Sequence, residues 1–290
     1  MKKLFIILVL LFPVITFAQS PFRFVFITDM HIQPESNAPQ GFKKAIDKIN
    51  ELNPDFVITG GDNIMDALGV DRDRMKLQFN LLDSMFKLFR MPVYPTIGNH
   101  DVFGIYPKSG IDPADPEYGK VVYENKFAKR YYSFNHKGVH FMILDGISVN
   151  EEKRKYYGRV DSEQMDWIKS DLEGLDKNTP VVVSIHIPLM TVFGQIIQSA
   201  TTGNDSSYVI ANAKEVLELF KDRNLKLVLQ GHLHFYEEIS LYKATFVTGG
   251  ALSGKWWQGP NMDIEEGFLL VDFDGKNFNW EYIDYGWNPL

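Results

Sequence analysis

The stretch Pro95-Thr96-Ile97-Gly98-Asn99-His100-Asp101 is the starting point for predicting the fold. It completes an apolar run that begins at Val93 and then changes abruptly to a glycine, an amide, an imidazole and a carboxylate. In open α/β sheets, ligands bind just outside the carboxyl ends of the strands. The stretch therefore predicts a buried strand that ends in a functional site. A single Asn-His-Asp string is also compatible with a polar turn, so the prediction depends on recurrence of the pattern.

The same pattern occurs at four further places in the chain. Each run is short and almost wholly apolar, which is typical of a strand that is covered on both faces. The four runs and the residues that follow them are Phe22 to Thr28 with Asp29-Met30-His31, Asp55 to Thr59 with Gly60-Gly61-Asp62-Asn63, Val181 to Ile185 with His186, and Leu225 to Gln230 with Gly231-His232-Leu233-His234.

Helical patterns separate the first three runs. The segment from Gly41 to Asn53 places apolar residues on one face and ends before Pro54, which cannot continue a helix. A second helix is predicted from Asp71 to Arg90. The resulting order of strand, helix, strand, helix and strand implies parallel pairing with right-handed crossovers.

The second half of the chain has more strand patterns. A hairpin is predicted from Tyr131 to Leu144, a helix begins at the capping pair Asp161 and Gln164, and the tail from Phe246 to Ile283 is rich in strands. Two sheets that share one core, with helices outside, accommodate this order best. No linker divides the chain, so we expect one domain over residues 19–290.

Composition narrows the classes of function. The chain has 290 residues, a net charge of −7 and no cysteine. Without a basic stripe, a nucleic-acid polymer or an anionic membrane surface is not expected as a partner. An anionic small molecule stays possible if bound cations invert the local field. The absence of cysteine excludes disulfides and thiolate zinc sites.

Residues 1–18 resemble a signal peptide. Lys2 and Lys3 precede the apolar run from Leu4 to Phe12, and Thr16-Phe17-Ala18 forms a small-x-small end. An uncleaved membrane anchor is the alternative, but it needs about 20 apolar residues and this run is interrupted by Pro13. We therefore expect cleavage after Ala18, a secreted or periplasmic protein, and no stable membrane insertion after cleavage.

The polar residues at the five strand ends form a coherent ligand set. Five of the seven histidines in the chain lie there. Imidazole nitrogens with carboxylate and amide oxygens suit Mn, Fe or Zn ions. The set exceeds what one ion needs and suits two divalent ions that share a carboxylate, an arrangement used in phosphoryl displacement. Its members are Asp29, His31, Asp62, Asn99, His100, His186, His232 and His234.

Taken together and in this order, the blocks resemble the calcineurin-like metallophosphoesterases over roughly residues 22 to 250. The resemblance implies a four-layer αββα sandwich of two mixed β-sheets flanked by helices, with a dinuclear metal site. It also implies a role for each residue. Asp29, His31 and His234 would hold the first metal, Asn99, His186 and His232 the second, and Asp62 would bridge them. His100 would stabilise the phosphate and protonate the leaving group, and Asp101 would orient the His100 ring.

The resemblance also indicates the reaction. Purple acid phosphatases carry a tyrosine ligand where this chain has Ile64 and Met65, so the pattern is nearer to bacterial cyclic-nucleotide-type phosphodiesterases. It implies hydrolysis of a small phosphodiester by in-line attack of a metal-bridging hydroxide. A phosphomonoesterase of the nucleotidase or sugar-phosphatase type is the alternative, followed by a non-catalytic scaffold. The sequence does not predict an oligomeric state.

Several residues outside the blocks are candidates for contacting the substrate. Trp256 and Trp257 are predicted either to wall a leaving-group pocket or to cap the core. Tyr106 lies in the long loop of residues 102–124, which we expect to form a rim of the site, although a loop aromatic can also pack under its own turn. A monoesterase would gain from extra cationic groups that hold its second negative charge, for which Lys108, Arg159 and Lys255 are candidates.

Overall fold

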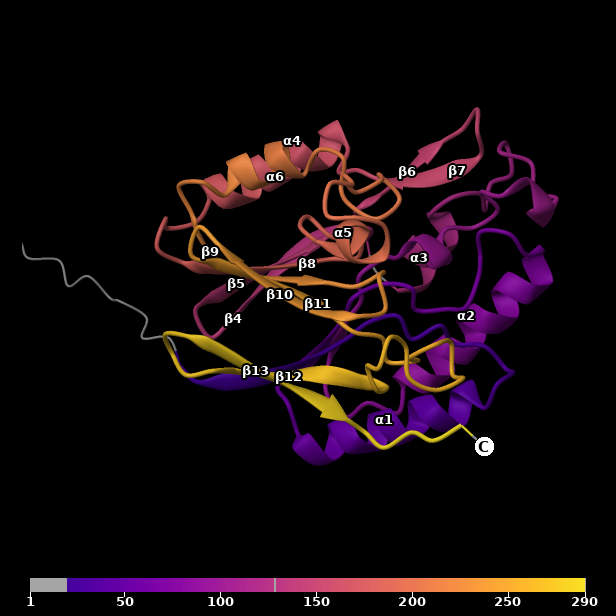
Figure 1. Cartoon of the computed structure of the whole chain (residues 1–290), viewed down its shortest axis with the longest axis horizontal. Helices are drawn as coiled ribbons and strands as arrows, with labels where there is room; N and C mark the ends of the chain where they lie inside the picture. The colour runs from indigo at the N-terminus through magenta and orange to yellow at the C-terminus, as the bar shows by residue number, and fades with distance from the viewer. Residues whose placement is uncertain (1–19, 128, 290) are drawn as a thin grey trace, which may run out of the picture.

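The computed structural model describes residues 20–127 and 129–289, so the signal peptide predicted for residues 1–18 lies outside the described part. Within this part, two mixed β-sheets stack face to face and helices cover both outer surfaces (Figure 1). The predicted αββα sandwich is therefore confirmed. Among the described helices, none combines the length and the apolar character that crossing a membrane requires.

The first sheet contains the three parallel strands expected from the amino-terminal half. Strands β1, β2 and β3 pair in parallel, and β12 and β13 extend the sheet in antiparallel fashion. Helices α1 and α2 connect the parallel strands. The bounds are β1 Phe22–Ile27, α1 Ala38–Leu52, β2 Phe56–Thr59, α2 Arg72–Phe86, β3 Val93–Tyr94, β12 Gly267–Phe273 and β13 Phe278–Asp284.

The second sheet has the order β10-β11-β9-β8-β5-β4, and its four central strands are parallel. Helices α4 and α6 cover its outer face (Figure 1). The bounds are β4 Tyr132–His136, β5 Val139–Leu144, α4 Ser162–Glu173, β8 Pro180–Ile185, α6 Ala213–Leu219, β9 Asn224–Gln230, β10 Tyr236–Leu241 and β11 Ala244–Gly249.

Some elements differ from the sequence predictions. The strand expected to continue to Ile97 stops at Tyr94, because Pro95 has no N–H to donate to the neighbouring strand. Helix α2 ends at Phe86 rather than Arg90. The sequence did not predict strand β10 or the small hairpin of β6 and β7. The remaining short elements are β6 Ile147–Asn150, β7 Lys155–Gly158, α3 Val121–Lys126, α5 Phe193–Ile197 and the 3-10 turns Asn99–Asp101 and Pro107–Ser109.

The strands are apolar throughout because both of their faces are buried. Alternate residues of β1 face the other sheet, and the residues between them face helices. The layer between the sheets is rich in aromatic side chains. The ring of Phe141 on β5 lies 5.5 Å from that of Phe24 and 5.2 Å from that of Phe56, centroid to centroid, so it joins the two sheets. This packing holds the strand ends in place.

We expect Phe141→Ala to lower the free energy of unfolding by about 3–5 kcal/mol, because it leaves a cavity between the sheets. The matched control is Leu77→Ala on the exposed face of α2, which should change stability by less than about 0.5 kcal/mol. Denaturant unfolding followed by circular dichroism measures both changes. Equal stability of the two variants would show that this aromatic contact does not hold the sheets together.

Candidate metal centre

All of the predicted ligand residues lie at one edge of the sandwich. The parallel strands of both sheets end there, so residues far apart in the sequence meet. Three overlapping groups of side chains are close enough to hold a metal ion. The groups are Asp29 with His31 and His234, His31 with Asp62 and His100, and Asp62 with His186 and His232.

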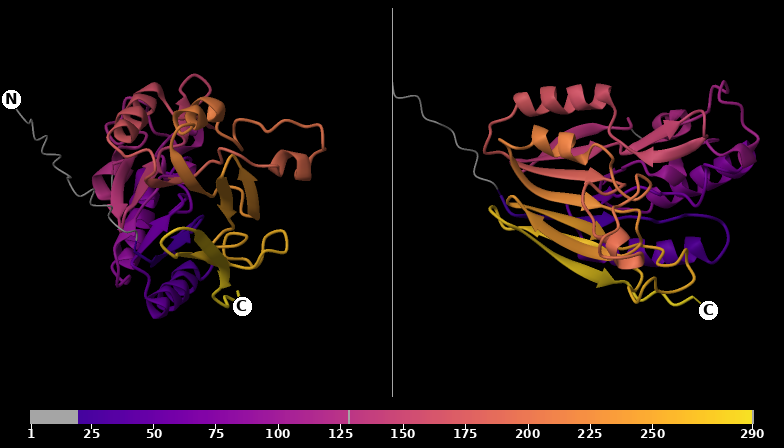
Figure 2. Two further views of the ribbon diagram at one scale, coloured as in Figure 1. Left: turned by 90° about the vertical axis from the view of Figure 1, so that its left-hand side faces the viewer. Right: turned by 45° about the horizontal axis from the view of Figure 1, so that its top comes forward.

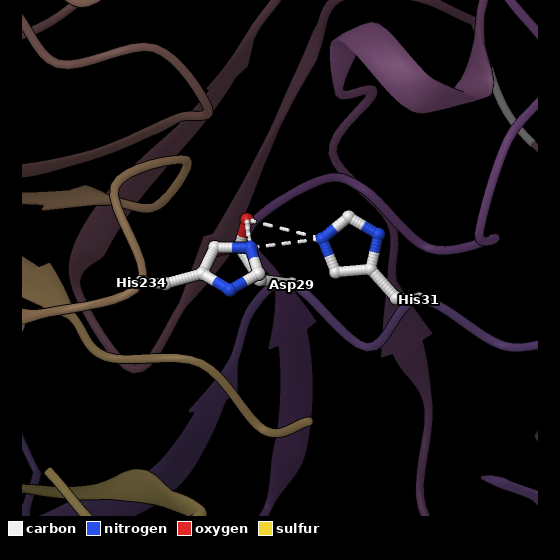
Figure 3. Close-up of side chains that lie close together, drawn as sticks. All are labelled: Asp29, His31 and His234. Atoms are coloured by element: carbon white, nitrogen blue, oxygen red, sulfur yellow. Dashed lines mark hydrogen bonds and ion pairs between the residues drawn. The ribbon is translucent and has the colours of Figure 1, made fainter. Parts of the chain in front are cut away.

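The first group points its donor atoms at one position (Figure 3). The Nε2 atoms of His31 and His234 are 2.9 Å apart, and His234 Nε2 is 3.3 Å from Asp29 Oδ1. Two imidazole nitrogens bound to one ion at about 2.0–2.1 Å are separated by roughly 3 Å. His234 Nδ1 donates to the Gly254 carbonyl at 2.9 Å, which leaves Nε2 free as a ligand. The geometry therefore fits a metal site.

The group that contains Asp62, His186 and His232 would hold the second metal, and it is arranged around His186. Its Nδ1 donates to the Gly60 carbonyl at 2.7 Å, so Nε2 is free to act as a ligand. That Nε2 atom lies 3.2 Å from Asp62 Oδ2 and 3.1 Å from Asn99 Oδ1. The amide oxygen of Asn99 thus points at the same position as the histidine and the carboxylate. This is the combination predicted for the second metal.

His232 completes the second group through a different ring atom. Its Nε2 donates to the Ser207 carbonyl at 2.7 Å, which leaves Nδ1 as the possible ligand. That Nδ1 atom is buried and has no hydrogen-bond partner among the described residues. Buried polar atoms are rarely left without a partner. A metal ion between His232 and His186 would supply the missing interaction.

Asp62 lies between the two groups. Its Oδ2 atom is 3.2 Å from His186 Nε2 and 3.8 Å from His31 Nε2. Its Oδ1 atom accepts a hydrogen bond from the backbone N–H of His100 at 2.8 Å, which fixes the orientation of the carboxylate. A carboxylate in this position can bridge two ions, as the motif resemblance implied.

The backbone is strained at the site. Five of the seven predicted metal ligands adopt positive φ angles, between 44° and 73°. Such conformations are costly for residues other than glycine, and they concentrate at functional sites. Gly98 has a related role, since a Cβ atom there would lie 2.1 Å from the backbone nitrogen of Asp62. The strained residues are Asp29, His31, Asp62, His232 and His234.

The electrostatics of the site favour bound cations. Burial opposes ionisation of Asp29, but the charge of His234 outweighs it and lowers the pKa of Asp29 to about 2. Burial likewise opposes protonation of His186, but the charge of Asp62 raises the pKa of His186 to about 9. In contrast, burial lowers the pKa of His232 to about 4. The two buried carboxylates thus attract positive charge, which protons supply when no metal is bound.

The surroundings of Asp101 differ from the prediction. Its carboxylate accepts hydrogen bonds from Asn63 Nδ2 at 2.7 Å and from the backbone N–H of Gly98 at 2.8 Å, and none from His100. Burial raises the pKa of Asp101 to about 6, and the charge of Asp62 adds to this effect. Asp101 therefore braces the loops that carry the ligands and does not orient the His100 ring.

The His100 ring is oriented by a backbone carbonyl. Its Nδ1 atom contacts the carbonyl oxygen of Met65. Because a carbonyl only accepts, Nδ1 carries the proton and Nε2 faces the site, 3.9 Å from Asp62 Oδ2. His100 also belongs to one of the candidate metal groups, so its predicted position off the metals requires a test.

A cavity of about 350 Å³ opens above these residues. Trp256 lines it, whereas Trp257 is buried in the core and donates from Nε1 to the His31 carbonyl at 3.2 Å. Tyr106 does not line the cavity, and the loop of residues 102–124 contributes nothing to it. The lining residues are His31, Asp62, Asn99, His100, Tyr156, Phe193, Tyr208, His232, Leu233, His234, Trp256, Asn261 and Met262.

The rim predicted from residues 102–124 is therefore formed by other segments. Tyr156 comes from β7, Phe193 from α5, and Asn261 with Met262 from the loop before β12. No local sequence pattern indicated their position, because a cavity wall is formed by residues that are remote in sequence. Lys108, a candidate cationic group, lies 3.6 Å from Asp66 and outside the lining.

Comparisons with known proteins place these observations in context. A family model described as calcineurin-like phosphoesterase matches residues 22–236. Purple acid phosphatase 15 of Arabidopsis thaliana is 33% identical over 109 residues, and the match spans 37% of this chain and only 17% of that protein.

Two solved structures illustrate the likeness of the fold. A dimetal phosphatase from Danio rerio has a TM-score of 0.60 at 15% identity, over 91% of this chain and 99% of its own. GAP50, the anchor in the inner membrane complex of Plasmodium, has a TM-score of 0.58 at 17% identity, over 92% of this chain and 85% of its own. At these identities the likeness shows the fold alone.

We expect Asp62→Ala to lose most of its bound metal, because the variant lacks the carboxylate that lies between the two metal groups. Elemental analysis after loading with Mn²⁺ and desalting measures the metal content, and the unaltered protein should hold about two ions per chain. The control is His136→Ala, whose ring lies outside the site and contacts Asp55 at 3.1 Å. Equal metal content in both variants would contradict the bridging role.

Proposed function

The chain belongs to the calcineurin-like phosphoesterase family, and from this premise we propose that it is a metal-dependent phosphodiesterase acting on small phosphate diesters. Its family and the side-chain groups at the strand ends imply a hydrolase with two divalent metal ions. The preference for a diester is the specific part of the proposal. It is supported by the chemistry of the cavity walls.

The observation that carries the proposal is that, among the described residues, neither lysine nor arginine lines the cavity. A phosphate monoester carries up to two negative charges near neutral pH, and a diester carries one. The second charge of a monoester would favour extra cationic side chains beside the metals, but the described walls are aromatic, apolar or amide-bearing. Such walls suit the second organic substituent of a diester.

The residues that would hold the ions are the two buried groups around Asp62. Asp29, His31 and His234 form one group, and Asn99, His186 and His232 the other. When bound, divalent ions in such a pair neutralise phosphate charge and make a water molecule more acidic. The carbonyls of Gly60, Ser207 and Gly254 hold three of the histidine rings in the required tautomers.

In this proposal, His100 is the residue that donates a proton to the leaving group. The Met65 carbonyl keeps the proton on Nδ1, so a second proton at Nε2 makes the ring a cationic donor that faces the cavity. From there it donates to a phosphoryl oxygen and gives its proton to the departing alcohol oxygen. Trp256, Phe193 and Tyr156 form aromatic walls around the same space.

After a phosphomonoesterase, a non-catalytic scaffold of this fold is the remaining alternative, because GAP50 is described as an anchor and shares the fold. A scaffold has no need to keep a complete ligand set. In this chain every predicted ligand is present, and their donor atoms meet. This completeness favours an enzyme, and the resemblance to cyclic-nucleotide-type phosphodiesterases favours a diester substrate.

We expect the Mn²⁺-loaded protein to hydrolyse bis-p-nitrophenyl phosphate faster than p-nitrophenyl phosphate, because no lysine or arginine among the described lining residues is placed to bind the second charge of the monoester. Release of p-nitrophenol measures both rates, and protein stripped of metal is the control. Faster hydrolysis of the monoester would overturn the diester assignment in favour of a phosphomonoesterase. No hydrolysis of either compound, with two ions bound, would support the scaffold.

We expect His100→Ala to keep its metal ions but to lose about 10²–10⁴-fold in the rate of diester hydrolysis. Elemental analysis and steady-state kinetics on the same sample separate the two effects. Unaltered turnover in a metal-replete variant would refute the proton-donor role. Loss of metal would instead show that His100 is a ligand, as one of the candidate groups permits.

A further inference from the structure

Exposed apolar side chains gather beside the cavity. Nine large hydrophobic side chains are exposed in the described part of the chain, and five of them lie in two segments that also line the cavity. We call residues 189–204 the α5 loop and residues 256–262 the tryptophan loop. The exposed side chains are Val192, Ile196 and Ile197 in the α5 loop, and Trp256 and Met262 in the tryptophan loop.

Both loops carry no charged residue. The α5 loop has none in sixteen residues and the tryptophan loop has none in seven, although 23% of the whole chain is charged. Exposed loops on a protein that stays in water usually contain charged side chains. Uncharged loops with exposed isoleucine, tryptophan and methionine are instead suited to the boundary between water and lipid.

The α5 loop is fastened to the metal centre. The ring of Phe193 lies 5.2 Å from that of Phe235, which directly follows the ligand His234. Asn204 closes the loop on itself, accepting from the N–H of Gly194 at 2.9 Å and donating to the Thr191 carbonyl at 2.8 Å. The apolar side chains are therefore held at a defined position beside the cavity.

The tryptophan loop is fastened to the same ligand. Asn261 Nδ2 donates to the His234 carbonyl at 2.7 Å, and the Trp256 ring lies 5.2 Å from the His234 ring. Buried Trp257 anchors the loop, while Trp256 and Met262 are 38% and 49% exposed and have positive φ angles of 51° and 49°. A strained backbone that keeps apolar side chains partly exposed indicates a functional surface.

The two loops project from the same side of the molecule. In the left-hand view of Figure 2, the salmon segment that carries α5 and the yellow loop before β12 both extend beyond the body of the sandwich. The cavity lies between residues of these loops, because Phe193 belongs to one and Trp256 with Met262 to the other. A flat apolar surface can thus meet both loops while facing the metal centre.

We propose that the α5 loop and the tryptophan loop dock the enzyme on a zwitterionic lipid surface, where the substrate is a phosphodiester headgroup. This inference rests on the proposed phosphodiesterase function. A lipid phosphodiester brings a single negative charge to the metals and apolar chains to the loops. Hydrolysis needs only water: one P–O bond to an alcohol breaks, a P–O bond to water oxygen forms, and the departing oxygen takes a proton.

The charge of the protein indicates the kind of lipid. The net charge of −7 repels an anionic surface, and exposed Lys255, which precedes the tryptophan loop, is balanced by exposed Asp263, which follows it. A zwitterionic headgroup such as phosphocholine imposes no such repulsion. Apolar contact then supplies the attraction, with Trp256 placed at the level of the headgroups.

The test compares two double variants whose substituted residues have similar exposure. Ile196 and Ile197 of the α5 loop are 55% and 43% exposed. Leu77, in α2, and Leu88, just after α2, lie outside both loops and are 50% and 43% exposed. Ile196→Ser with Ile197→Ser removes part of the docking surface. Leu77→Ser with Leu88→Ser removes equal apolar surface elsewhere. Thermal melting shows whether both variants remain folded.

The first readout is co-sedimentation of the Mn²⁺-loaded protein with phosphatidylcholine vesicles. We expect the unaltered protein and the leucine variant to bind, and the isoleucine variant to bind about tenfold less. Failure of the unaltered protein to bind, or equal binding by both variants, would overturn the docking proposal. A dimer in analytical ultracentrifugation that the isoleucine variant loses would assign the surface to a second copy of the chain and also overturn it.

The second readout is hydrolysis of vesicle lipid beside soluble bis-p-nitrophenyl phosphate. We expect the isoleucine variant to lose about tenfold on vesicle lipid and to keep its rate on the soluble diester. Vesicle binding with turnover of the soluble diester but no lipid product would overturn the lipid substrate alone. No turnover of the soluble diester would overturn the proposed function. The docking proposal would still be tested, because co-sedimentation with vesicles does not depend on turnover.

Discussion

The burial of Asp29 and Asp62 is the constraint on which the rest of the site depends. Both carboxylates are almost wholly excluded from water at the ends of β1 and β2. A buried charge is strongly unfavourable unless it is paired. The surrounding histidines supply partial compensation through protons, as the raised pKa of His186 shows. Two metal ions would compensate the charges fully and would also give the unpartnered Nδ1 of His232 a partner.

The aromatic layer between the sheets makes this arrangement possible. Side chains such as Phe24, Phe56 and Phe141 lock the two sheets at one spacing, so strand ends from different sheets stay within bonding distance. The strained φ angles of the ligand residues persist because packing and hydrogen bonds on both sides determine them. Asp101 contributes here as a brace: it accepts from Gly98 and Asn63, which flank the ligands Asn99 and Asp62.

The base of the cavity and its walls differ in chemistry. The base is polar and charged, whereas the described wall residues are aromatic, apolar or amide-bearing and include no lysine or arginine. The walls come from segments attached to His232 and His234: Ser207 precedes Tyr208, and Asn261 precedes Met262. The turn that carries His232 and His234 therefore holds two candidate metal ligands and also contacts segments of the cavity wall. This link explains why the apolar loops are ordered beside the site.

The sequence by itself determined the buried parallel strands, their order and the candidate ligand residues at their ends, because buried strands read as apolar runs and their polar ends are local features. It did not determine which contacts form across the sheets. The partner of Asp101, the division of Trp256 and Trp257 between cavity and core, and the place of Tyr156 in the wall were decided by the tertiary structure. Hydrogen bonds and cavity walls join residues remote in sequence, and no local pattern records which of them will meet.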